Sequence, residues 1–485
     1  MDGLLRLLGL RYATAALVLV ALAALYGAAS LSRPSATARE KGAHTPVTSA
    51  VAVCPGHEDG RVSVQSPAGT APGGHAEVTA TRGGRPLAAF DAPGRGWHRD
   101  LAAMADSVTV RARGPLAAGL SAEQTTHWPG GPDRGLAGVR CAVPGTDLWF
   151  TGPGPVIADS LDLYLTNVDA QPASVDLTAI SDAGPLDTTD GLATPVAPAT
   201  TRVVRLGRSP EGLGDVLRSA RDLALHVRTT GGRVAASLRA RLGEGKGIEW
   251  VPLSAAPAPA LVVPGVPSGP GGRWLLVAVP GDTAARVRVQ VITPDGGYAP
   301  QGQDVLDAPA RSVASLDLAK ALSGKPAAVR LVADRPIVAG LVAERGADVA
   351  YGTATAPLGP PDGSGRPSSG VVADVRLDST LTLTAPSGPA TVQVTPMAPW
   401  GPGTPQTVSV PAGRTVETRL TAPPGSGEGY GAVVTPKPGS SPVYAARTLS
   451  TGEDDDYLFT VLPMNPAVTA QWLPKVGDSQ TTLND

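Results

Sequence analysis

Short runs in which apolar and polar residues alternate recur along most of the chain. Examples are RVSVQSPAG (61–69), LDLYLTNVDAQPASVDLTAI (161–180), WLLVAVPGDTAARVRVQVI (274–292) and LTLTAPSGPATVQVTPM (381–397). Alternation with a period of two residues is typical of β-strands that bury one face, and the Gly and Pro residues between the runs are typical of turns. The pattern therefore predicts an all-β protein.

The strand pattern repeats about every hundred residues, as the turn positions show: Pro67, Asn167, Pro280 and Pro386. Each copy also contains a strand, a turn and a strand, found at 106–123, 222–240, 327–344 and 431–449, and a closing strand follows them. About seven short strands per hundred residues is typical of an Ig-like β-sandwich, whereas propeller blades repeat every ~40–50 residues. We therefore expect four tandem β-sandwich repeats that follow one another end to end.

The N-terminal segment carries a long uncharged stretch from Tyr12 to Leu31. Roughly 20 apolar residues suffice to span a bilayer as a helix. The same stretch fits a signal peptide, because Gly27 and Ala29 form a small-x-small pattern before Ser30. Its length favours an uncleaved anchor, and both interpretations place the rest of the chain outside the cytoplasm.

These patterns divide the chain into successive segments. We expect a transmembrane anchor or signal segment at 1–31, a linker at 32–50, β-sandwiches at 51–146, 147–255, 256–358 and 359–467, and a flexible tail at 468–485. The 59 Gly and 49 Pro residues suit a chain with many turns. A formal net charge of −2 offers no basic surface for nucleic acid.

The chain has two cysteines, Cys54 and Cys141. In an exported protein such a pair most simply forms a disulfide. Cys54 lies on the opening strand of the first repeat, and Cys141 lies where the other copies place their closing strand. The bond is therefore expected to join the first and last strands of the first sandwich.

An aromatic pair, Trp149 and Phe150, follows Cys141 in a chain with only 4% aromatic residues. The stretch TDLWFTGPGP (146–155) is predicted to be the joint between the first and second sandwiches. Trp149 and Phe150 are then expected to be buried at the interface of these two repeats. A ligand platform is the alternative interpretation.

Motifs for catalysis, metals or cofactors are not evident. Four histidines fall in the first repeat, at positions 57, 75, 98 and 127, but none has the spacing that zinc sites favour. The acidic run at 453–456 lacks the alternating ligands of a calcium loop and is predicted to be a hairpin tip. GSGEGYG (425–431) does not match a phosphate-binding loop. We therefore expect no catalytic residue, no metal and no cofactor.

The segment CAVPGTDLWFTG (141–152), together with the repeats over roughly 50–465, resembles an actinobacterial family of unknown function. The resemblance implies an exported β-repeat protein with an N-terminal membrane segment. It also implies a gene that often neighbours one for a membrane glycosyltransferase. The family has no catalytic residues to transfer to this chain.

These observations favour a non-enzymatic extracytoplasmic scaffold or interaction module of the cell envelope, with the membrane and an envelope protein or glycan as partners. A carbohydrate- or wall-binding protein is one alternative, and an accessory subunit of a membrane glycosyltransferase is another. A hydrolase or transferase whose carboxylates gather across repeats is a further one. Carbohydrate binding predicts that some of the tryptophans share one exposed face: Trp97, Trp128, Trp149, Trp250, Trp274, Trp400 and Trp472.

Overall fold

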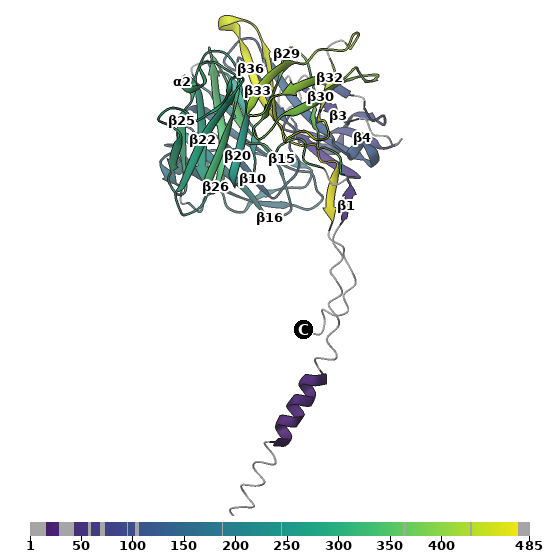
Figure 1. Ribbon diagram of the computed structural model, residues 1–485, viewed down its shortest axis with the longest axis vertical. Coiled ribbons are helices and arrows are strands. Elements are labelled where there is room, and N and C mark those ends of the chain that lie inside the picture. Colours follow the sequence, from purple (N-terminus) through teal and green to yellow (C-terminus); the bar gives the residue numbers. More distant parts are fainter. Residues whose placement is uncertain are drawn as a thin grey trace, which may run out of the picture. The chain divides into compact units, whose positions relative to one another are not determined.

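The computed structural model describes residues 16–28, 43–56, 60–67, 73–94, 96–101, 106–186, 188–243, 245–361, 365–426 and 429–473 (Figure 1). The strands pair in antiparallel sheets, so the all-β prediction is confirmed. The chain divides into two units, Pro46–Gln471 and a second unit made of Met1–Thr45 with Trp472–Asp485.

The N-terminal part contains a helix at residues 16–28. Two strands near the ends of the described chain, β1 (Ala43–Pro46) and β37 (Ala470–Leu473), form a small sheet. Among the described residues, no helix has both the length and the apolar character needed to cross a membrane. Residues 12–15 and 29–31 of the predicted anchor lie outside the described residues.

Within Pro46–Gln471 the strands form four sheet pairs, numbered here in chain order. In sheet pair 1, one sheet is β2 (Ser49–Cys54), β7 (Val108–Arg113), β4 (His75–Ala80) and β5 (Pro86–Phe90), and the other is β6 (Gly96–Leu101), β3 (Gly60–Gln65), β8 (Ser121–Trp128) and β9 (Gly135–Arg140). In sheet pair 2, one sheet is β13 (Gly184–Pro185), β12 (Ala173–Ser181), β16 (Asp222–Gly231), β10 (Asp147–Pro153) and β19 (Leu253–Ser254), with β14 (Thr194–Val196) on β12. The other is β15 (Thr200–Arg205), β11 (Ala158–Asn167), β17 (Ala235–Leu242) and β18 (Ile248–Val251).

Sheet pairs 3 and 4 continue the chain. Sheet pair 3 contains β23 (Gly296–Tyr298), β22 (Ala285–Thr293), β26 (Ala327–Arg345), β21 (Arg273–Val279), β25 (Ser312–Asp317), β20 (Ala258–Val266), β24 (Val305–Ala308) and β27 (Asp348–Thr353). In sheet pair 4, one sheet is β28 (Gly370–Val372), β34 (Gly431–Pro436), β30 (Ala390–Ala398), β31 (Gly401–Pro402) and β32 (Gln406–Val410), and the other is β33 (Arg414–Arg419), β29 (Asp378–Ala385), β35 (Tyr444–Thr451) and β36 (Leu458–Met464). The connections include the short helices η1 (Arg82–Gly84), η2 (Gly114–Ala117), η3 (Pro210–Gly212), η4 (Gly214–Leu217), α2 (Ala319–Leu322) and η5 (Asp454–Asp456).

The alternation in the sequence explains why each sheet pair encloses a core. On β11, Leu161, Leu163 and Leu165 point to one side and are buried against Leu148 and Phe150 of the facing sheet. The residues between these leucines point to the opposite face, because successive side chains of a strand alternate. The other three sheet pairs enclose cores in the same way.

The segment 327–344, predicted as a strand, a turn and a strand, is one continuous strand. β26 first pairs with β20 and β22, and its second half pairs with β21 and β27. It therefore passes from one sheet of pair 3 to the other. The middle of this segment, ADRP, has no glycine for a tight turn, whereas the segment in pair 2 has Gly231 and Gly232 there.

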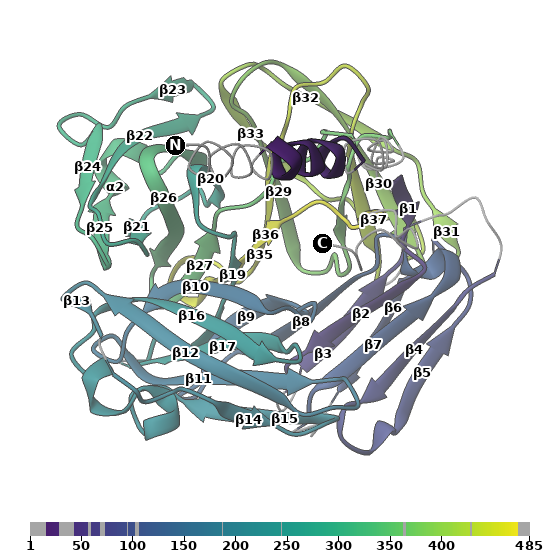
Figure 2. The same ribbon diagram turned by 90° about the horizontal axis from the view of Figure 1, so that it is seen from below.

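The four sheet pairs close into a ring (Figure 2). Four edge strands, one from each sheet pair, contact one another in cyclic order, so that pair 4 contacts pair 1: β9, β18, β27 and β36, called here the closing strands. The end-to-end arrangement expected from the sequence is therefore wrong. The closing contacts join residues more than 300 positions apart, such as Glu123 and Arg447, and a strand pattern does not encode such contacts.

Each junction of the ring contains a cluster of buried apolar side chains. The clusters include Val139, Tyr164 and Trp250 between pairs 1 and 2, Trp149, Leu276 and Val338 between pairs 2 and 3, Ala350, Ala446 and Phe459 between pairs 3 and 4, and Leu136, Leu449 and Leu458 between pairs 4 and 1. The last junction also holds a buried ion pair, in which Arg447 Nη2 lies 3.0 Å from Glu123 Oε2.

The aromatic pair lies elsewhere than the sequence predicted. Trp149 and Phe150 belong to β10, an inner strand of pair 2 that pairs with both β16 and β19, and not to a joint between repeats. Phe150 is buried in the core of pair 2, and Trp149 packs on Leu276 and Val338 of pair 3. Neighbouring residues of a strand point to opposite faces, so the two rings cannot share one interface.

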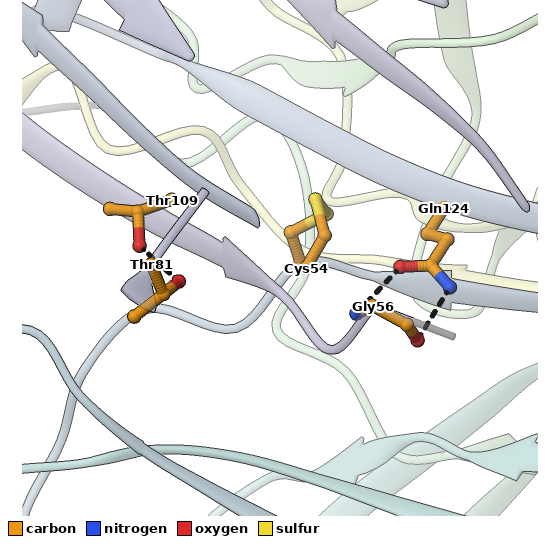
Figure 3. The surroundings of a disulfide bond; sticks show 6 residues. Cys54, Gly56, Thr81, Thr109 and Gln124 are labelled. Carbon is orange, nitrogen blue, oxygen red and sulfur yellow. Dashed lines mark hydrogen bonds between the residues drawn. A yellow bond between two sulfur atoms is a disulfide. The ribbon is translucent and has the colours of Figure 1, made fainter. Parts of the chain in front are cut away.

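The disulfide between Cys54 and Cys141 is confirmed. It joins the end of β2, at the edge of one sheet of pair 1, to the residue that follows β9, at the edge of the other. Beside it, the side-chain amide of Gln124 accepts the N–H of Gly56 and donates to its carbonyl, at 3.1 and 3.0 Å (Figure 3). Gly56 has φ of +74°, and a Cβ there would lie 2.2 Å from the carbonyl oxygen of Asp106, so only glycine fits this turn.

Candidate functional site

A cleft of about 340 Å³ opens where sheet pairs 2 and 3 meet. Its pair 2 wall includes Ile157, Asp222 and Lys246, and its pair 3 wall includes Trp274 and Glu344. This volume falls at the lower end of the range of small-molecule sites, which is about 300–1,000 Å³. The cleft is therefore large enough to hold a small ligand or one segment of a polymer.

The pair 3 wall is the outer face of adjacent strands. On β21, Trp274 and Leu276 point into the cleft while Leu275 and Val277 fill the core of pair 3. Trp274 is opposite Val342 of β26, and Val342 is in turn opposite Tyr351 of β27. The strand period thus places an apolar row across this wall.

Asp222 is the most perturbed carboxylate of the cleft. Burial, and to a lesser extent the charge of Asp182, raises its pKa to about 6. Asp182 accepts the backbone N–H groups of Arg221 and Asp222 at 2.9 and 3.2 Å, which fixes the start of β16. Near neutral pH Asp222 is therefore mainly a carboxylate that accepts hydrogen bonds, and it gains a proton when the pH falls below about 6.

An ion pair crosses the cleft from one sheet pair to the other. Lys246, in the connection between β17 and β18, has its Nζ 3.0 Å from Oε1 of Glu344 on β26. Both side chains are about one third exposed, at 35% and 31%. This pair therefore offers a donor and an acceptor to a ligand as well as holding the two walls together.

The indole of Trp274 is partly exposed in the cleft. It lies over Gly272, where a Cβ would come within 2.0 Å of the ring atom Cη2, so a larger residue would displace the ring. A flat apolar surface beside carboxylates and an ammonium group suits a ligand with one apolar face and several hydroxyls. A sugar ring has these features.

A family of unknown function, DUF5719, matches residues 97–421, about two thirds of the chain. The chain belongs to this family. The matched residues run from β6 to the end of β33 and include both walls of the cleft. A search of curated proteins finds no match.

The residues considered from sequence lie apart from the cleft of this DUF5719 chain. His75 is on β4 beside Glu77 at 3.1 Å, His98 is on β6 and His127 is on β8. His57 lies outside the described residues. The acidic run is at η5 between β35 and β36, where Asp456 lies 3.5 Å from Arg134. In the described part of the chain, no three His, Cys, Asp or Glu residues gather as metal ligands would.

The tryptophans do not form a single exposed face. Trp149 and Trp250 are buried at junctions, with 9% and 2% exposure, whereas Trp400 and Trp472 are 55% and 54% exposed. Of these tryptophans, Trp274 lines the cleft, where it lies among carboxylates. Sequence reasoning named Trp274 but missed Asp222 and Glu344, because the cleft joins strands of two repeats.

A histidine that sequence reasoning overlooked is joined to the aromatic pair. His226 of β16 is opposite Trp149 of β10, and the two rings stack with centroids 4.0 Å apart. Oδ1 of Asp147 lies 2.8 Å from Nε2 of His226 and accepts the indole N–H of Trp149 at 3.0 Å. The spacing of Asp147 and Trp149 by two residues was the available signal, since it places both on one face of the strand.

Two buried carboxylates lie at the centre of the ring. Glu249 of β18 accepts the N–H of Gly138 on β9 at 3.2 Å, and Asp348 of β27 accepts the N–H of Phe459 on β36 at 2.6 Å. Burial raises the pKa of Asp348 to about 7 and that of Glu249 well above its usual value. These carboxylates satisfy backbone donors of neighbouring sheet pairs, so we assign them to ring closure.

We expect Asp348 to make the protein less stable as the pH rises. Its pKa is higher in the folded chain than in the unfolded chain, so ionisation favours the unfolded state between about pH 4 and pH 7. From pH 5 to pH 8 this lowers the free energy of unfolding by about 2 to 3 kcal/mol. Urea unfolding at several pH values measures the change.

The Asp348→Asn variant provides the comparison for this pH dependence. Partial burial lowers the pKa of His98 and His127 in the folded chain, which makes the protein more stable as the pH rises. Both histidines remain in the variant, so their effect is the same in the two proteins. Asp222 and Glu249 also remain, and the variant lacks the charge of Asp348 that helps to raise the pKa of Glu249, a change that acts in the same direction as the loss of Asp348 itself. The difference in stability between the wild type and Asp348→Asn should therefore fall with pH, and a constant or rising difference would contradict the assignment.

Proposed function

We propose that this DUF5719 protein is a non-enzymatic binding scaffold of the cell envelope that holds a glycan segment in the cleft between sheet pairs 2 and 3. Four Ig-like sandwich repeats form the scaffold, and the N-terminal segment 12–31 tethers it at the membrane. The disulfide supports a location outside the cytoplasm, where such bonds form and persist.

The observation that carries the proposal is the combination of groups in the cleft. Trp274 offers a flat apolar surface, and Asp222, Glu344 and Lys246 offer acceptors and a donor around it. These groups can hold a ligand by stacking and hydrogen bonding, without a chemical reaction. The closed ring supports this role, because walls that come from two sheet pairs keep their spacing when every sheet pair is held by two neighbours.

Replacing Trp274 by alanine should weaken glycan binding about tenfold or more, since this removes the stacking surface. The ligands are soluble oligosaccharide fragments of peptidoglycan and of arabinogalactan, and isothermal titration calorimetry measures the dissociation constant. Trp274→Phe should keep part of the affinity, because it keeps a flat ring.

Trp400→Ala is the matched control, since Trp400 is an exposed tryptophan of pair 4 that is not in the cleft. This variant should bind like the wild type. The proposal is wrong if the wild-type protein binds neither kind of fragment, or if Trp274→Ala binds as tightly as the wild type.

A further inference from the structure

A second cavity, of about 640 Å³, lies on the outer face of the sheet formed by β15, β11, β17 and β18. Four arginines line it: Arg202, Arg205, Arg208 and Arg239. Its carboxylates are Asp162 and Glu211. We refer to it as the arginine pocket.

The register of three strands builds the floor of the arginine pocket. Asp162 of β11 is opposite Arg205 of β15 on one side and Arg239 of β17 on the other. Its Oδ2 lies 3.0 Å from Nη2 of Arg239, whereas its Oδ1 is 3.8 Å from Nε of Arg205. One carboxylate therefore serves two guanidinium groups and engages only one of them closely.

The other two arginines are held at the rim. Arg208 donates from Nη2 to the backbone carbonyl of Asp159 at 3.0 Å. Arg202 donates to the carbonyl of Pro195 at 3.0 Å and lies 3.6 Å from Glu211. These contacts orient the two guanidinium groups, and Glu211 alone offsets their charge.

The charges of the arginine pocket do not balance. Four guanidinium groups face two carboxylates, which leaves an excess of two positive charges. The whole chain has a formal net charge of −2, so the excess is a local arrangement and not a result of composition. An excess of two positive charges matches a ligand that carries two negative charges.

A buried donor in this pocket also lacks a partner. The side chain of Arg239 is only 13% exposed, and its Nε is buried and has no hydrogen-bond partner among the described residues. Its guanidinium lies 5.6 Å from the ring centre of Tyr164, which lines the same pocket. Burial raises the pKa of Tyr164, so its phenol stays neutral.

We propose that the arginine pocket binds a phosphate monoester carried on a small polar group such as a sugar. Guanidinium groups bind phosphate through paired hydrogen bonds, and a phosphate monoester carries close to two negative charges at neutral pH. The cavity is larger than a phosphate group, which leaves room for the attached sugar. This site is separate from the glycan cleft, and its ligand is recognised by charge.

Isothermal titration calorimetry with glucose 1-phosphate, inorganic phosphate and glucose tests this proposal. Glucose 1-phosphate should bind, and its affinity should fall as salt is added because the interaction is ionic. Inorganic phosphate should bind more weakly, because it does not fill the cavity. Arg205→Gln should weaken the binding of glucose 1-phosphate at least tenfold, and the 76% exposure of this side chain makes the substitution safe for folding.

Arg218→Gln is the matched control. Arg218 is also exposed, at 68%, and belongs to the same sheet pair, but it pairs with Asp215 and does not line the pocket. It should leave the affinity unchanged. The proposal fails if glucose 1-phosphate does not bind, if glucose binds equally well, or if Arg205→Gln binds like the wild type. Trp274→Ala should keep this binding, which separates a failure here from a failure of the glycan cleft.

Discussion

Replacing both Cys54 and Cys141 by alanine is expected to lower the free energy of unfolding by about 4 to 5 kcal/mol. The bond closes a loop with a sequence separation of 87 residues, and this loop contains nearly all of sheet pair 1. Without the bond the unfolded chain gains the conformational freedom that the closed loop denies it. Guanidinium unfolding of the variant and the wild type measures the loss.

The folded structure of this variant should change little. Val53 and Ala142, next to the two cysteines, exchange two backbone hydrogen bonds of 2.8 Å that do not depend on the bond between the sulfur atoms. The two sheets of pair 1 should therefore stay joined at this edge, and the circular dichroism spectrum should match that of the wild type. Reducing the wild-type disulfide should reproduce the loss of stability. A change below about 0.5 kcal/mol would show that the hydrogen bonds alone hold this edge.

The strand content could be predicted because one sequence signal controls it. In LDLYLTN the three leucines alternate with polar or aromatic residues, and β11 follows this alternation with its leucines in the core. The turn after β11 carried its own signal in Asn167, whose side chain binds the backbone at Gln171, Val196 and Asp169. Local signals of this kind act over a few residues, which suffices to predict that the protein is all-β.

The ring could not be predicted because its contacts use residues that look ordinary in sequence. Ala137 and Ala350 are small apolar residues on closing strands, and nothing in a single strand distinguishes a face that meets another sheet pair from one that meets water. The cleft was missed for the same reason. Asp222 and Trp274 lie 52 positions apart and become neighbours of one cavity only when two sheet pairs meet.

Charged residues in two of the closing strands, β18 and β27, did indicate local burial. Glu249 is the second residue of β18 and Asp348 is the first residue of β27, in strands whose other residues are mostly apolar. A carboxylate within an apolar strand is costly to bury unless backbone or side-chain donors meet it. Each carboxylate therefore indicated that its strand starts in a buried environment, but neither showed which sheet pair supplies the donors.

Replacing Glu123 by glutamine should destabilise the protein by about 3 to 5 kcal/mol, because it leaves a buried guanidinium without its counter-charge. Arg447 and Glu123 are 1% and 3% exposed, and their ion pair joins pair 4 to pair 1. Among the described residues, neither Nε nor Nη1 of Arg447 has a hydrogen-bond partner. Burial lowers the pKa of Arg140, and the charge of Glu123 raises it, so a second arginine also loses its counter-charge.

This prediction tests whether the buried ion pair contributes to closing the ring. Thermal unfolding measures the loss of stability, and small-angle X-ray scattering measures whether the Glu123→Gln variant expands as pair 4 separates from pair 1. Asp215→Asn is the control, because it breaks an exposed ion pair with Arg218 and should cost about 1 kcal/mol or less. The double variant Glu123→Met with Arg447→Met removes both charges of the pair, and with them the repulsion of Arg140 by Arg447. It should recover part of the stability, since apolar side chains often replace a buried ion pair without loss, although Arg140 still lacks the charge of Glu123. If Glu123→Gln were as stable as Asp215→Asn, the apolar cluster of Leu136, Leu449 and Leu458 would be sufficient to close the ring.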